Sequence, residues 1–88
     1  MNQEHILVRL SYAVGDEPDL LNTVDRLTLE NEVKVRLVQY FDVTGIAPVK
    51  GESLVTDLFN ARTTIRINQR IMHFYAQEEF CLYDVELG

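Results

Sequence analysis

Cysteine is nearly absent from this sequence, and its scarcity limits the chemistry available. Cys81 is the one cysteine among 88 residues, so the chain forms no internal disulfide and lacks the thiolate pairs of zinc and redox sites. The two histidines, His5 and His73, do not have the spacing of a metal-binding motif. We therefore expect no metal and no cofactor, with Cys81 as a small core residue. The lack of disulfides suits a reducing compartment, the cytoplasm of a cell or of an infected host.

Long apolar runs and basic charge are also missing. No segment approaches the roughly 18 apolar residues that span a bilayer, and the residues before Ile6 lack the basic stretch of a signal peptide. Eight Lys and Arg residues against 14 Asp and Glu residues give a net charge of -6. Such a charge repels nucleic acid at long range and favours basic partners. We expect no membrane insertion, no direct nucleic-acid binding, and a protein partner with a basic surface.

Catalytic motifs are absent as well. The loop at 45–53 contains glycines, a lysine and a serine, but Lys50 precedes Gly51, and Glu52 would repel a phosphate, so this loop is not a P-loop. No nucleophile elbow surrounds Ser53. The sequence therefore predicts a protein that is not an enzyme.

What the sequence does contain is alternation of apolar and polar side chains, which is typical of strands. It predicts a strand over residues 5–14 and another over 32–44, the second interrupted by Gln39. A third extended region begins at Arg62. Turns near residues 68–69 and 77–79 would divide it into an antiparallel meander, although a single long strand over 62–77 is the alternative.

Two short helices are expected between these strands. Residues 18–27 have apolar side chains at helical spacing after Asp16, a potential N-cap, although residues 26–29 could instead form a short strand. Residues 52–61 have a similar amphipathic pattern. The prediction is one α+β domain over residues 1–88, a mainly antiparallel sheet with one or two short helices packed on one face. Its predicted core is Ile6, Val8, Leu10, Val33, Val35, Leu37, Leu58, Ile65 and Val85.

Candidate partner-binding residues fall into three groups, the first two being an acidic set and a loop pair. The acidic set comprises Asp16, Glu17, Asp19, Glu30, Glu32, Glu78 and Glu79. The loop pair is Ile46 and Val49, which flank the rigid Pro48. This pair forms either a small contact knob or a cover over the edge of the core.

A third candidate surface is an arginine stripe of Arg62, Arg66 and Arg70, whose spacing of four places them on one face of a regular strand. Arginine suits bidentate binding of phosphate or carboxylate groups. The alternative is internal pairing with Asp84 and Glu86 on the last strand. We favour internal pairing, because the acidic and basic segments are near neighbours in sequence.

These observations favour a small non-catalytic interaction module, an inhibitory or regulatory binder of the kind found among bacterial and phage accessory proteins. One alternative is a homo-oligomeric structural subunit, a dimer or larger assembly whose strands pair edge to edge. A small enzyme is the other. An unpaired apolar or acidic patch would favour the interaction module, and self-assembly would favour the structural subunit. A concave pocket around His73 or Cys81 would favour the enzyme.

Overall fold

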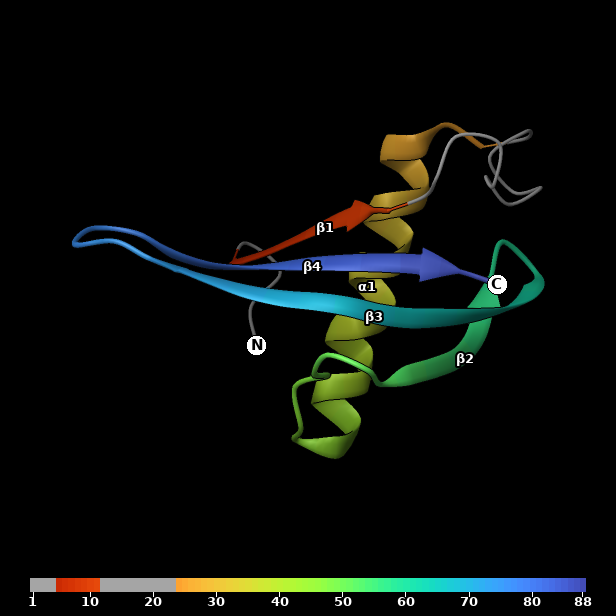
Figure 1. The fold of residues 1–88 in the computed structure, drawn as a ribbon. Helices are drawn as coiled ribbons and strands as arrows, with labels where there is room; N and C mark the ends of the chain where they lie inside the picture. The colour runs from red at the N-terminus through yellow and green to blue at the C-terminus, as the bar shows by residue number, and fades with distance from the viewer. Residues whose placement is uncertain (1–4, 12–23) are drawn as a thin grey trace.

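The computed structural model describes residues 5–11 and 24–88 and forms one α+β domain (Figure 1). Its elements are β1 (Ile6–Leu10), α1 (Arg26–Thr44), β2 (Ser53–Leu58), β3 (Ala61–Phe74) and β4 (Glu79–Leu87). The strands lie in the order β1-β4-β3-β2, with β1 parallel to β4 and the other pairs antiparallel. Helix α1 covers one face of the sheet. The expected fold class is confirmed, with one long helix within the described residues.

Helix α1 replaces the strand predicted over residues 32–44, and that prediction is wrong. Leu29, Val33 and Leu37 recur every fourth residue and are fully buried against the sheet. The alternation that suggested a strand does not match burial, because Val35 is half-buried and Val43 is 86% exposed. The apolar residues therefore form a helical stripe.

Both ends of α1 carry capping signals. The Asp25 carboxylate accepts hydrogen bonds from the Thr28 backbone N–H and hydroxyl, both at 2.9 Å, and these bonds lower the pKa of Asp25. Gly45 ends the helix at φ 72°, and its N–H donates to the Phe41 carbonyl at 2.7 Å. The alternative strand at 26–29 is therefore wrong. Most of the helix predicted at 18–27 lies outside the described residues.

A β-hairpin replaces the second predicted helix, at 52–61. Strands β2 and β3 pair from Ser53 opposite Arg66 to Leu58 opposite Ala61. Phe59 and Asn60 form the connection with φ of 50° and 67°, the positive values of a type I′ turn. Phe-Asn is not a common pair for such a turn, so the sequence carried little hairpin signal here.

Strand β3 is the single long strand that we gave as the alternative. The expected turn at 68–69 is instead a β-bulge, since Ile67 lies opposite Val85 and Gln69 opposite Asp84, leaving Asn68 as the extra residue. The chain reverses near the second expected position, where the Tyr75 N–H donates to the Glu78 carbonyl at 2.8 Å.

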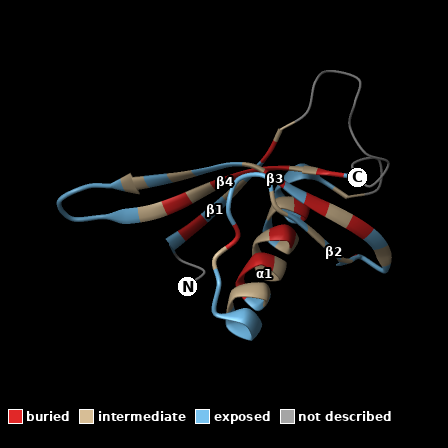
Figure 2. Ribbon diagram, turned by 60° about the horizontal axis from the view of Figure 1, so that its bottom comes forward, coloured by how far each residue is buried: buried red, intermediate tan, exposed pale blue. Residues whose placement is uncertain are grey.

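The core lies between α1 and the sheet (Figure 2). Seven of the nine predicted core residues are buried, and Val8 and Val35 are half-buried. Cys81 is also buried, as expected. The first strand is observed over Ile6–Leu10, while Tyr12 and Val14, which we assigned to it, fall outside the described residues. None of the described residues forms a helix with the length and apolar character needed to cross a membrane.

Candidate functional site

The bulge at Asn68 divides the arginine stripe between the two faces of the sheet. Before the bulge, Arg66 lies opposite Glu86, on the face away from α1. After it, Arg70 lies opposite Tyr83, a buried residue on the helix side. The prediction that the three arginines share a face is wrong for Arg70, because one extra residue reverses the alternation along β3.

On the face away from α1, charges are paired internally. Arg66 forms an ion pair with Glu86 at 3.8 Å, one of the pairs that we expected. Asp84 pairs instead with Arg9 of β1, at 3.0 Å. Arg62 lies opposite Asp57 in the ladder but forms no ion pair within 4.0 Å among the described residues.

The acidic candidates that the structure describes do not form one surface. Glu30 accepts a hydrogen bond from the Leu10 backbone N–H at 2.9 Å, and Glu32 forms an ion pair with Arg36 at 3.3 Å, so both serve local structure. Glu78 and Glu79 are exposed where β3 turns into β4. They lie beyond the Ile6 end of β1, whereas Glu30 contacts the Leu10 end. Asp16, Glu17 and Asp19 lie outside the described residues.

The loop after α1 exposes its apolar pair rather than folding it over the core. Ile46 and Val49 are both exposed, whereas Pro48 between them is fully buried. The buried Tyr83 hydroxyl donates to the Pro48 carbonyl at 3.0 Å and fastens the loop to β4. Burial raises the pKa of Tyr83 to about 12, with the neighbouring Cys81 adding to the rise.

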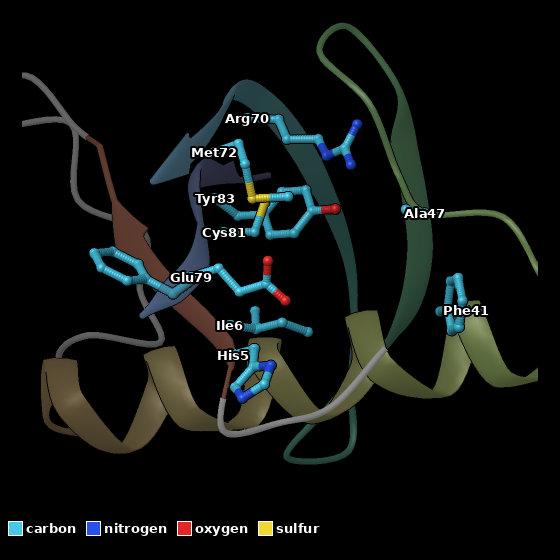
Figure 3. A pocket seen from close by; sticks show the side chains of 10 residues that line it. His5, Ile6, Phe41, Ala47, Arg70, Met72, Glu79, Cys81 and Tyr83 are labelled. Carbon is cyan, nitrogen blue, oxygen red and sulfur yellow. The ribbon is translucent and has the colours of Figure 1, made fainter. Parts of the chain in front are cut away.

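Beneath this loop lies a pocket of about 290 Å³ on the helix side of the sheet (Figure 3). Its walls come from the start of β1, the C-terminal part of α1, the loop, and the β3–β4 hairpin. The residues lining it are His5, Ile6, Phe41, Ala47, Arg70, Met72, Glu79, Phe80, Cys81 and Tyr83. Most of this surface is apolar, with one arginine and one glutamate among the charged groups.

A pocket around Cys81 is the feature that we associated with an enzyme. No hydrogen bond joins Cys81 to His5 or Glu79, the groups in the pocket that could act as a base, within the part of the chain that the structure describes. The described residues also contain no cluster of three or more potential metal ligands. The described residues therefore line a cavity in which no nucleophile–base pair or metal-ligand cluster is assembled.

The other prominent surface is the end of the β3–β4 hairpin, which we call the arm (residues 72–80). It projects beyond α1 and β1, because β1 begins its pairing with β4 only at Cys81 (Figure 1). Phe74 is 76% exposed, Tyr75 58% and Met72 55%. On the face away from α1, the His73 ring stacks on the Phe80 ring, with 4.4 Å between the ring centroids.

The predicted site residues include Glu78 and Glu79 of the arm but not its exposed aromatic residues, and of the pocket lining they include only Arg70 and Glu79. A signal for the arm was present, since Phe74 and Tyr75 directly precede the acidic turn. The pocket had no such signal, because it is assembled from four separate segments and depends on the bulge.

Comparisons with known proteins add no evidence about the arm or the pocket. Neither a scan of protein-family models nor searches of curated proteins and of solved structures found a match to this chain.

Proposed function

We propose that this protein is a non-catalytic interaction module that binds a basic surface of a partner protein through its arm. The observation that carries this proposal is the exposure of Met72, Phe74 and Tyr75 on a hairpin that projects from the domain. Aromatic side chains are enriched among the residues that dominate binding energy at protein interfaces. An inhibitory or regulatory role follows if the arm occupies a functional surface of the partner.

The chemistry of the arm favours a partner rich in lysine or arginine. Exposed Glu78 and Glu79 stand directly beside the aromatic residues. Carboxylates attract basic side chains, and aromatic faces bind the same cations through cation–π contacts. The arm thus combines apolar area with negative charge. This combination complements lysine and arginine side chains, which have an apolar stem and a charged end.

The test is affinity purification of the tagged chain from its native host with mass spectrometry, in which an arm variant serves as the reference. The variant Phe74→Ser with Tyr75→Ser removes the aromatic rings. The matched control is Val43→Ser, which removes an exposed apolar side chain at the far end of α1.

We expect a partner that is retained by the wild type and by Val43→Ser but lost with the arm variant, and that contacts the chain through a basic surface. Circular dichroism of both variants checks the fold. A partner retained equally by all three proteins would show that the arm is not the binding surface.

A homo-oligomeric subunit is the second candidate, favoured by strand β2. It lies at the edge of the sheet, and its central Val55 is 68% exposed. An edge with an outward apolar residue is a template for pairing with another copy. Sedimentation velocity over a concentration series tests this candidate, since Val55→Lys should then convert an oligomer into a monomer.

A further inference from the structure

Arg70 reaches the pocket only because of the β-bulge. Without Asn68 as an extra residue, Arg70 would follow Arg66 on the face away from α1. Bulges bend a strand and redirect the side chains beyond them, and they are frequent beside functional sites. A long cationic side chain has thus been turned into a largely apolar cavity.

Arg70 also has no carboxylate partner within the described residues. The arginines that do form ion pairs within 4.0 Å are Arg9, Arg26, Arg36 and Arg66. Arg70 is exposed at the pocket, and its side chain interacts with the Tyr83 hydroxyl; because a guanidinium has five N–H donors, this contact leaves others for an anion. Its planar fork of donors matches a carboxylate.

The charges of the pocket are separated along the sheet. Arg70 lies opposite Tyr83, whereas Glu79 lies opposite Phe74 at the other end of the pocket. At about 3.3 Å per residue, Tyr83 and Glu79 are about 13 Å apart along β4. Met72, Cys81 and Tyr83 lie between the two charged side chains (Figure 3). The cavity therefore has the Arg70 cation at one end, an apolar middle, and the Glu79 carboxylate together with the His5 ring at the other end (Figure 3).

We propose that this pocket binds a small amphipathic monoanion, an aliphatic carboxylate. The carboxylate pairs with Arg70, and the hydrocarbon chain lies over Met72 and Cys81 toward Glu79. A second carboxylate at the far end of the ligand is rejected, because Glu79 repels it. The volume of about 290 Å³ is at the lower limit of ligand pockets, which suits a short chain.

Titration of the isotope-labelled protein with hexanoate, followed by amide chemical shifts, tests the proposal. Saturable shifts are expected at residues lining the pocket, with adipate, the dianion of the same length, binding about tenfold more weakly. Arg70→Gln should weaken hexanoate binding about tenfold or more, in line with the loss of a charge-assisted hydrogen bond. Arg62→Gln is the matched control, since Arg62 also lacks an ion pair among the described residues but lies on the other face.

Glu79→Gln provides a second variant for the test. This variant should bind adipate nearly as well as hexanoate, because the repulsive charge is gone. Absence of saturable shifts, or equal weakening by Arg70→Gln and Arg62→Gln, would overturn the proposal. The arm and the pocket share Met72 and Glu79, but the two proposals can be distinguished, because partner binding is tested at Phe74 and Tyr75, which do not line the pocket.

Discussion

Tyr83 connects three parts of the molecule through one side chain. Its ring is buried between the sheet and α1, and its hydroxyl holds the loop after α1 through Pro48. It also forms part of the pocket wall. A buried tyrosine usually has a partner for its hydroxyl, and here that partner is the Pro48 carbonyl.

We predict that Tyr83→Phe destabilises the protein by about 1 to 3 kcal/mol, because the buried Pro48 carbonyl loses its donor. Equilibrium denaturation at neutral pH measures this loss. A conservative comparison is Tyr40→Phe, since Tyr40 is half-buried on α1. Equal, negligible losses in both variants would contradict the importance of this hydrogen bond.

The raised pKa of Tyr83 also predicts alkaline behaviour. The folded state keeps the Tyr83 proton up to about 12, whereas the unfolded chain releases it near 10. The stabilisation is complete below 10 and is lost as the pH rises through about 12, because the folded state binds more protons in that window. Wild-type stability should therefore fall more steeply than that of Tyr83→Phe between pH 10 and 12. Parallel alkaline profiles would contradict this.

At the scale of elements, α1 illustrates how a helix is stabilised by packing. Its sequence is rich in β-branched residues, which have modest helix propensity. Leu29, Val33 and Leu37 nevertheless bury one face completely. Burial of this stripe, together with the Asp25 and Gly45 caps, outweighs the intrinsic preference for a strand.

Paired substitutions distinguish a helix from a strand over residues 32–44. Leu37→Ala should cost about 2 to 5 kcal/mol, because Leu37 is fully buried under the sheet. Val43→Ala should change stability by less than about 0.5 kcal/mol, since α1 exposes Val43. Denaturant midpoints measure both, and a large loss at Val43 would restore the strand interpretation.

The β2–β3 turn contains a bulky residue in a conformation that disfavours it. Phe59 has φ of 50°, and a left-handed backbone costs an ordinary residue about 1 to 2 kcal/mol. Replacing Phe59-Asn60 by Asn-Gly, the preferred type I′ pair, should raise stability by about 1 kcal/mol. Thermal unfolding measures this gain. A lower melting temperature would indicate that packing of the Phe59 ring outweighs the strain.

At the scale of the whole molecule, net charge sets how the protein meets a basic partner. With a charge of -6, association through the arm should slow as salt rises, whereas dissociation should change less. Glu78→Lys with Glu79→Lys should lower the association rate without altering the fold. Arg66→Glu should mainly lower stability, because it breaks the pair with Glu86. A flat salt series, or a folded Arg66→Glu that no longer binds, would move recognition to the face away from α1.

The fold class was predictable from the sequence, whereas the type of several elements was not. The extended C-terminal region, the first strand and most of the core follow from alternation of apolar residues. Alternation of apolar and polar residues identifies a strand only where the spacing of the apolar residues does not also fit a helix. Val33, Leu37 and Phe41 are spaced by four, an interval that fits one face of a strand and one face of a helix equally well.

Contacts between elements that are distant in the sequence select among these alternatives. Packing against the sheet selects the helix over residues 26–44, and pairing with β3 selects a strand at β2. The pocket depends on the register between β3 and β4, where Asn68 turns Arg70 toward the helix side. No local pattern specifies that shift, because it arises from the pairing of two strands rather than from the residues of one.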